Sequence, residues 1–201
     1  MMSDKYGTGK DPYCYSSTNV LINLLDIRDA QILEDAERDI TVIRADEVEF
    51  IPPPYSFDQL CRLHKTLFGD LYPWAGDIRK IDISKGNTRF CNLTRIDAEI
   101  AKLFTQLSKA SFFQDLGREA LIAAVAKFYG DLNMIHPFRD GNGRAQRLFF
   151  EHLITNAGYQ IYWVSIKQDT WIEANIAAVT CDYSLLEAIF DRCICEPLTD
   201  E

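Results

Sequence analysis

The sequence contains no apolar run that approaches the roughly 20 residues of a membrane-spanning helix. Its opening segment, Met1 to Pro12, is polar and lacks the apolar core of a secretory signal peptide. Both absences argue against an exported or membrane-embedded protein. We therefore expect a soluble protein of the cytoplasm that has no membrane partner.

Positive charge is also scarce. The chain has 21 lysine and arginine residues against 30 aspartate and glutamate residues, which gives a formal net charge of −9. A nucleic acid is repelled by such a surface unless a local basic patch overcomes the repulsion. The composition therefore disfavours direct binding of nucleic acid.

The six cysteines lack the spacing of a zinc finger and are scattered along the chain. Cys61 lies three residues before His64, and Cys193 and Cys195 form a C-x-C pair, but neither pair has enough neighbouring ligands for a closed zinc site. Scattered cysteines in a cytoplasmic protein are typical of reduced thiols in the core. We expect neither disulfide bonds nor a zinc site.

A length of 201 residues is typical of one domain, which we expect to span residues 1–201. Apolar residues three and four positions apart predict helices along most of it. The expected helices are a short one capped by Thr18 with Val20 to Leu25 inward, one through Ile32, Leu33, Ala36, Ile40 and Ile43, one from the capping box of Ser56 and Gln59 to about Gly69, one opened by Thr94 and Asp97, and the segments 118–135, 144–156, 170–179 and 184–193.

Two segments have a different period. Residues 78–90 alternate apolar and polar side chains around Lys85-Gly86-Asn87-Thr88, a turn-like sequence, and this pattern is typical of a small hairpin. Residues 159–164 fit a short strand. The sequence therefore predicts an all-α domain, a helical bundle around a central helix pair, with one inserted β-hairpin.

One stretch concentrates the chemistry: HPFRDGNGRAQR, from His136 to Arg147. His136 follows a buried helix and can accept a proton from a hydroxyl as a general base. Asp140 offers a hard oxygen ligand suited to Mg²⁺, which usually binds one or two carboxylates together with substrate phosphates. These two residues alone are compatible with a buried histidine and a helix N-cap.

The remainder of the stretch favours binding of an anion. Gly141-Asn142-Gly143 stands at the start of a helix, where backbone N–H groups can face a phosphate. Arg144 and Arg147 follow three residues apart on one helix face, and two planar guanidinium groups can clamp a polyphosphate. Taken singly, the same residues fit a plain turn and surface charges. Together with His136 and Asp140 they are the parts of a phosphoryl or nucleotidyl transfer site.

The stretch resembles, position for position, the signature HxFx[D/E]GNGRxxR of the Fic-domain family. Trp74-Ala75-Gly76, followed by Ile78-Arg79 and the expected hairpin, resembles the flap of that family. Asp11-Pro12-Tyr13 resembles the start of its short bacterial, toxin-type members. The resemblance therefore extends over most of the chain, although only the motif is highly specific.

The resemblance implies a Fic fold that binds ATP with Mg²⁺ and transfers AMP to a side-chain hydroxyl of a protein, with release of pyrophosphate. It makes His136 the base, Asp140 the Mg²⁺ ligand and Phe138 an apolar anchor. It assigns the binding of the nucleotide phosphates to Gly141, Asn142, Gly143, Arg144 and Arg147. It also implies that the hairpin aligns an extended segment of the target by main-chain pairing, and the contact residues we expect are Ile83, Ser84, Lys85 and Gly86.

Two other functions are compatible with the motif. A related branch transfers a phosphate instead, but it carries lysine in place of the second glycine, so Gly143 favours AMP transfer. A silent nucleotide-binding module would be natural if His136 or Asp140 were replaced, and neither is.

The resemblance also bears on targets and control. The toxin-type members include enzymes that modify bacterial type II topoisomerases, so a subunit of that class is an expected target. Many members carry an inhibitory helix, [S/T]xxxE[G/N], whose glutamate pairs with the second arginine of the motif. No glutamate of this chain precedes glycine or asparagine. We therefore expect a small antitoxin partner whose helix supplies that glutamate to Arg147.

Overall fold

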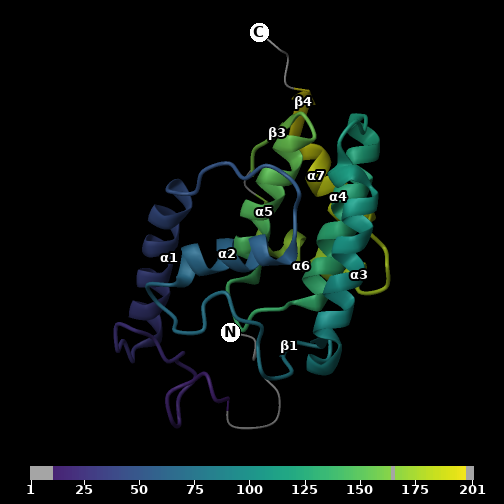
Figure 1. Cartoon of the computed structure of the whole chain (residues 1–201). Helices are drawn as coiled ribbons and strands as arrows, with labels where there is room; N and C mark the ends of the chain where they lie inside the picture. The colour runs from purple at the N-terminus through teal and green to yellow at the C-terminus, as the bar shows by residue number, and fades with distance from the viewer. Residues whose placement is uncertain (1–10, 164–165, 198–201) are drawn as a thin grey trace.

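The computed structural model describes residues 11–163 and 166–197. Within those ranges the chain is mostly helical, as expected, with two small two-stranded sheets (Figure 1). The helices are α1 (Ala30–Asp46), α2 (Phe57–Phe68), α3 (Ile96–Lys109), α4 (Arg118–Ile135), α5 (Asn142–Asn156), α6 (Gln168–Ala178) and α7 (Ser184–Cys193). The strands β1 (Ser84–Lys85) and β2 (Thr88–Arg89) pair antiparallel, as do β3 (Tyr159–Ile161) and β4 (Ile194–Pro197).

Helices α4 and α5 form the centre of the bundle. α4 packs against α3, α5, α6 and α7, and α5 packs against α2 and α4. In Figure 1, α1 stands at one side and α3 and α4 at the other, with α2 and α5 between them. The α4 side chains Leu121, Val125 and Leu132 are fully buried, and each contributes roughly 1.5–3 kcal/mol by leaving water.

Helix α2 begins as the sequence predicts. The Ser56 side chain accepts a hydrogen bond from the third residue of the helix, and the Ser56 N–H donates to Gln59 Oε1 at 2.8 Å. This reciprocal capping box satisfies backbone donors that have no partner inside the helix. It fixes the direction of α2, whose last residue, Phe68, packs beneath the site described below.

Helix α1 forms where expected but turns a different face inward. Leu33 and Thr41 are its buried residues, whereas Ile32 and Ile43 are 58% and 59% exposed. The expected helix thus forms, but two of the apolar positions that indicated it, Ile32 and Ile43, lie outside its buried face. Apolar residues surround this helix on several sides, so their spacing does not determine which face meets α2.

The predicted helix after Thr18 is absent, and that prediction was also wrong. Thr18 closes a turn instead, since its N–H and Oγ1 both donate to the Tyr15 carbonyl, at 3.1 and 3.0 Å. Val20 is buried, whereas Leu24 and Leu25 are exposed rather than inward. A helix this short gains too few hydrogen bonds to offset its nucleation, and a run of serine, threonine and asparagine favours turns.

Four element ends differ from the prediction. A 3₁₀ turn, η1 (Leu93–Arg95), precedes α3, and Asn92 rather than Thr94 caps it, because Asn92 Oδ1 accepts the Thr94 N–H at 3.0 Å. Helices α5 and α6 each begin two residues earlier than expected. The expected strand 159–164 ends at Ile161, and its last residue, Val164, lies outside the described residues.

The six cysteines are free thiols, as expected, but only Cys193 is fully buried. The expectation that the cysteines lie in the core therefore holds fully for Cys193 alone.

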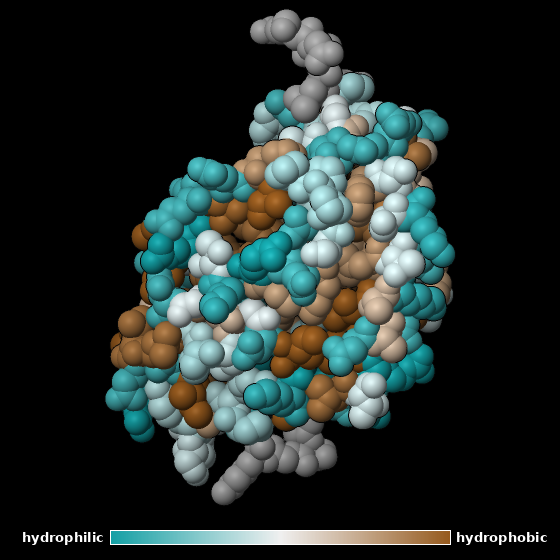
Figure 2. Space-filling model, in the orientation of Figure 1, coloured by the Kyte–Doolittle hydropathy of each residue, from teal (hydrophilic) through white to brown (hydrophobic). Residues whose placement is uncertain are grey.

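Among the described residues, no helix combines the length and apolar character that crossing a bilayer requires. Hydrophilic residues cover much of the face in Figure 2, and hydrophobic surface is exposed at several places on it, one of them between α1 and α5.

Candidate active site

The loop between α4 and α5 is held by its own side chains. Asn142 Oδ1 accepts the Phe138 N–H at 2.9 Å, and Asn142 Nδ2 donates to the Phe138 carbonyl at 2.8 Å. The Phe138 ring is buried and stacks on His64 with centroids 3.9 Å apart. Phe138 is thus the anchor that the sequence predicts, and the Asn142 side chain is used by the loop itself.

Gly141 is the tightest point of the loop. Its φ of +74° lies in the left-handed region that favours glycine. A Cβ here would lie 2.4 Å from two ring carbons of Phe68 and 3.1 Å from His64 Nε2. Only glycine therefore fits this position.

Gly143 has the opposite surroundings. A Cβ on Gly143 would meet no atom within 4 Å, so the space beside it is open. Gly143 lies in the first turn of α5, where backbone N–H groups have no partner inside the helix and the helix dipole favours an anion. This combination of open space and unpaired helix donors fits a bound phosphate.

Asp140 stands beside this helix start. Its Oδ1 accepts the Gly141 N–H at 2.7 Å, and its side chain is half-buried. The described residues contain no group of three or more histidine, cysteine, aspartate or glutamate side chains that could hold a metal. A single carboxylate next to a phosphate site fits Mg²⁺, which takes its remaining ligands from phosphate and water.

His136 caps the C-terminus of α4 in a left-handed conformation, with φ 48° and ψ 62°. Its Nδ1 lies 3.0 Å from the Asn133 carbonyl oxygen. Because a carbonyl only accepts, this hydrogen bond places the ring hydrogen on Nδ1 and the lone pair on Nε2. The imidazole also stacks on Phe90, with centroids 3.9 Å apart and an interplanar angle of 15°.

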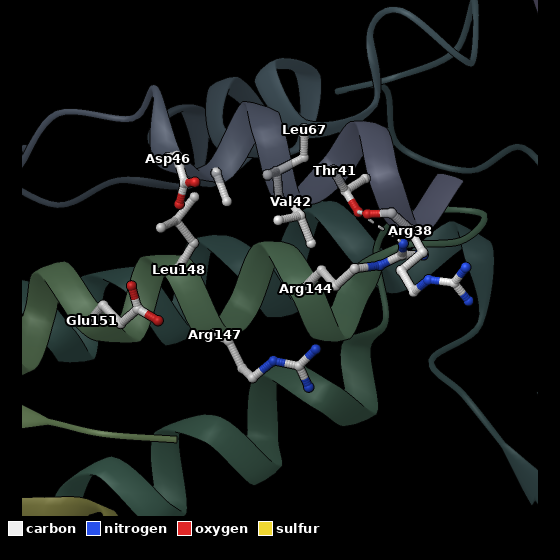
Figure 3. Close-up of a pocket in the computed structure, with 10 residues that line it drawn as sticks. Arg38, Thr41, Val42, Asp46, Leu67, Arg144, Arg147, Leu148 and Glu151 are labelled. Atoms are coloured by element: carbon white, nitrogen blue, oxygen red, sulfur yellow. Dashed lines mark hydrogen bonds between the residues drawn. The ribbon is translucent and has the colours of Figure 1, made fainter. Parts of the chain in front are cut away.

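The two motif arginines leave α5 in different directions (Figure 3). Arg144 forms an ion pair with Glu37 of α1 and donates to Thr41 Oγ1 at 3.3 Å. The Arg147 side chain forms no hydrogen bond or ion pair within the described part of the chain. Of the two arginines expected to clamp a polyphosphate, Arg144 is therefore already paired with α1 and Arg147 is not.

Arg147 is one of the residues that line a groove between α1 and α5 with a volume of about 480 Å³. Its apolar walls are Val42, Ala45, Leu67 and Leu148. Glu151 also lines it and accepts the Trp163 indole N–H at 2.5 Å. Figure 3 shows Arg144 directed toward α1 and Arg147 away from it.

The Fic/DOC family model matches residues 54–154, a range that includes this loop. The probable protein adenylyltransferase Fic of Salmonella typhimurium is 40% identical over 195 residues, which are 97% of this chain and 98% of the relative. The counterpart with the same description in Escherichia coli is 37% identical over 195 residues, again 97% of this chain and 98% of the relative. The chain belongs to the Fic/DOC family.

The structure of the BepC protein of Bartonella tribocorum with bound AMPPNP matches this chain with a TM-score of 0.84, and the N-terminal Fic domain of a putative cell filamentation protein of Bartonella quintana matches it with a TM-score of 0.83. BepC is 25% identical, and its match covers 93% of this chain and 97% of BepC; the Bartonella quintana domain is 27% identical, and its match covers 92% of each chain. The all-α fold predicted from the motif is thereby confirmed as a Fic fold.

The Fic flap is a very short hairpin. β1 and β2 pair Ser84 with Arg89 and Lys85 with Thr88, and the Phe90 N–H donates to the Ile83 carbonyl at 3.2 Å. Ile83 is buried, Ser84 is half-buried, and Lys85 and Gly86 are exposed. The structure thus places four expected contact residues in one hairpin but turns the Ile83 side chain into the protein.

The register shows which flap backbone groups face outward. In an antiparallel pair, residues that bond across the ladder alternate with residues whose N–H and C=O point away from the partner strand. Ile83 bonds to Phe90, so the next residue, Ser84, directs its backbone groups to the outer edge. Ser84 is therefore the residue of β1 that can pair with an added strand.

Three groups in the Fic site were not identified from the sequence. Buried Arg79 donates to the His136 carbonyl at 2.9 Å. Asp11, which the resemblance includes without a role, forms an ion pair with buried Arg139 of the loop. His64, considered in the sequence only as a zinc ligand and set aside, donates from Nε2 to the Asp140 carbonyl at 2.9 Å. No local pattern reveals them, since each partner is more than 50 residues away.

His64 makes the stability of this Fic domain depend on pH. Burial lowers the pKa of His64 to about 4, and its Nδ1 accepts the Gly76 N–H at 2.9 Å. Between pH 6.5 and 4 the unfolded chain therefore binds a proton that the folded chain does not, so stability is complete above pH 6.5 and is lost as the pH falls through this window. We expect a loss of roughly 3 kcal/mol in unfolding free energy.

Urea unfolding between pH 7.5 and 4 measures this loss. His64→Gln, which cannot titrate, provides the control and should reduce the pH dependence. His152, whose pKa burial also lowers, contributes equally to both proteins and cancels in the comparison. Parallel curves for wild type and His64→Gln would show that His64 does not titrate in this window.

Proposed function

We propose that the loop from His136 to Arg147 performs AMP transfer with His136 as the general base. The chain is a protein adenylyltransferase whose donor is ATP. The observation that carries the assignment of roles is the open, donor-rich start of α5 beside Gly143, next to a histidine whose hydrogen bond to Asn133 leaves the lone pair on Nε2. Base and phosphate site thus belong to one loop.

In the proposed reaction, Nε2 of His136 takes the proton of a serine, threonine or tyrosine hydroxyl of the target. The hydroxyl oxygen bonds to the α-phosphorus of ATP, the bond from that phosphorus to the bridging oxygen breaks, and pyrophosphate leaves. Two features of the chain favour this step: the first N–H groups of α5 stabilise negative charge on the phosphates, and Asn142 keeps the loop in shape.

We assign the outer phosphates to Arg147 and Arg144. Arg147 has no ion pair in the described chain and can turn toward a phosphate, whereas Arg144 is oriented by Glu37. Asp140 would hold Mg²⁺ together with the phosphates, and the ion would neutralise phosphate charge. We also propose that the chain is a single Fic domain whose flap lies at about 78–90.

The proposed target site is the outer edge of β1. Ser84→Pro removes the outward N–H and adds a ring at the edge, where proline is tolerated because the ladder does not use that donor. We expect AMP transfer to protein to fall by roughly tenfold or more, while ATP binding and melting temperature stay near those of wild type.

Thr88→Pro serves as the matched control, since its N–H bonds across the two-residue hairpin and its loss should disturb the flap itself. AMP transfer is followed with labelled ATP, and ATP affinity by calorimetry. Undiminished transfer by Ser84→Pro would show that targets do not pair with this edge.

We also propose that the enzyme is a cytoplasmic toxin restrained by a small antitoxin. The groove beside Arg147 has apolar walls that suit the apolar face of a helix, and a glutamate on that helix would meet Arg147. A bidentate, charge-assisted pair with the guanidinium would occupy the position proposed for the outer phosphates. A type II topoisomerase subunit is the target class we propose first.

Mass spectrometry of cytosolic proteins incubated with ATP and the purified chain tests the function. A gain of AMP on a hydroxyl side chain is the expected result, and a His136→Ala sample identifies background modification. A gain of phosphate would instead assign the chain to phosphate transfer, and no gain would identify a silent nucleotide-binding module.

A further inference from the structure

We propose that Phe90 and Arg79, which stand at the two ends of the flap segment, are positioning residues that hold His136 in the orientation its role requires. The inference rests on the proposed function, because it takes His136 as the base. Both residues lie outside the motif, and they act on its first residue through direct contacts.

Phe90 fixes the plane of the imidazole. Its ring lies against the His136 ring at a centroid distance of 3.9 Å and an angle of 15°, so the two faces are in contact. Phe90 is 8% exposed and is tied to the flap through its N–H, which donates to the Ile83 carbonyl at 3.2 Å. Rotation of the imidazole would therefore lose the stacked face as well as the hydrogen bond to Asn133.

Arg79 fixes the backbone that carries the imidazole. Its fully buried guanidinium donates to the His136 carbonyl at 2.9 Å and to the Ile135 carbonyl at 3.4 Å, at the end of α4. The same group donates to the carbonyls of Ile81, at 2.5 Å, and Cys91, on the flap side. One planar fork of donors thus joins both ends of the flap to the last turn of α4.

Two backbone contacts complete the connection. The Arg79 N–H donates to the Pro137 carbonyl at 2.8 Å, and the Cys91 N–H donates to the Met134 carbonyl at 2.9 Å. The left-handed conformation of His136 is one that residues with a side chain rarely adopt. The carbonyl groups on both sides of it are held by the flap segment, which accounts for its persistence.

As a consequence, the same hairpin positions both the target segment and the base. A segment that pairs with the outer edge of β1 is placed relative to a hairpin that cannot move without moving His136. The hydroxyl and Nε2 are thereby aligned by one rigid unit. Misplacement of a catalytic group by about 1 Å can cost roughly 100-fold in rate, so loss of this frame should appear in turnover rather than in nucleotide affinity.

The test compares Phe90→Leu with Phe104→Leu in the full chain. Both phenylalanines are 8% exposed and contact other rings, but Phe104 packs against Phe57, Phe128 and Phe149 instead of His136. AMP incorporation into proteins of a cytosolic extract is measured over a series of ATP concentrations. Phe90→Leu should lower the maximal rate roughly 10- to 100-fold with the apparent KM for ATP within about threefold of wild type.

Two further variants keep the test decisive. Phe90→Tyr retains the aromatic face and should restore the rate to within about threefold of wild type. Arg79→Lys retains the charge but cannot reach four carbonyls, and should lower the maximal rate as Phe90→Leu does. Equal losses in Phe90→Leu and Phe104→Leu, or no recovery in Phe90→Tyr, would overturn the inference.

A spectroscopic measurement separates this inference from the proposed function. The chain has three histidines, so ring nitrogens labelled with ¹⁵N can be assigned with a His136→Ala sample. At pH 8.5 wild type should show His136 as the tautomer protonated at Nδ1, whereas Phe90→Leu should show averaging between tautomers and Phe104→Leu should not. An unchanged His136 signal in Phe90→Leu overturns the positioning role. Absence of AMP transfer by wild type overturns the proposed function alone.

Discussion

Replacing His136 by alanine is expected to lower AMP transfer by roughly 100- to 10,000-fold while the affinity for ATP changes by less than about threefold. A general base contributes roughly 100- to 10,000-fold, and it acts on the proton of the target hydroxyl rather than on the phosphates. The phosphate site lies at the start of α5, where the imidazole provides no donor. Transfer from labelled ATP and calorimetry with ATP measure the two quantities separately.

His152→Gln is the matched control, because His152 lies on the far half of α5 and its Nδ1 accepts the Ile51 N–H at 3.1 Å. A glutamine retains an acceptor there, and transfer should remain near that of wild type.

Growth of cells that express each variant gives an independent measurement of the same loss. Cells that express wild type should grow slowly, cells that express His136→Ala should grow normally, and a co-expressed antitoxin should rescue the former. Full transfer by His136→Ala would end the general-base assignment.

Much of the site could be predicted because it is local in sequence. The Asn142 side chain bonds both backbone groups of Phe138, four residues earlier, so one short pattern contains the hydrogen bonds that shape the loop. Helices α4 and α7 were predicted at their observed bounds because regular apolar spacing and clear end signals agree there. A helix can be predicted from the sequence where its helix propensity, its apolar pattern and its end signals agree.

The features of the site and the fold that the sequence did not predict depend on long-range contacts. Glu37 reaches Arg144 from 107 residues away, and Arg79 reaches His136 from 57 residues away. The residue types alone do not identify these partners, because glutamate and arginine are common on exposed helix faces and in turns. The inward face of α1 and the pairing of β3 with β4 have the same origin. They follow from packing between segments, which single-sequence periodicity does not encode.

Gly141→Ala is expected to destabilise the domain by about 2–5 kcal/mol and, with it, to remove ATP binding. An alanine in the left-handed region costs roughly 1–2 kcal/mol, and overpacking of a core typically costs about 1–3 kcal/mol more. The obstacle is the Phe68 ring, 2.4 Å from the added Cβ, and Phe68 is itself 1% exposed and has little room to shift. Urea unfolding and thermal melting measure the loss, and an unchanged melting temperature would contradict the steric argument.

Gly143→Ala, two residues along, should give the opposite result for stability. Its Cβ meets no atom within 4 Å and its φ lies outside the left-handed region, so the chain accepts it. Alanine in a helix is favoured over glycine by roughly 0.5–1 kcal/mol, and the melting temperature should hold or rise slightly. The same methyl group occupies the open space in front of the first N–H groups of α5, and ATP affinity should therefore fall by about tenfold or more. A stable Gly143→Ala variant that binds ATP as wild type does would show that the phosphates do not approach α5 beside Gly143. Loss of ATP binding in a fully folded variant would instead show that the phosphates need the space that this glycine leaves open.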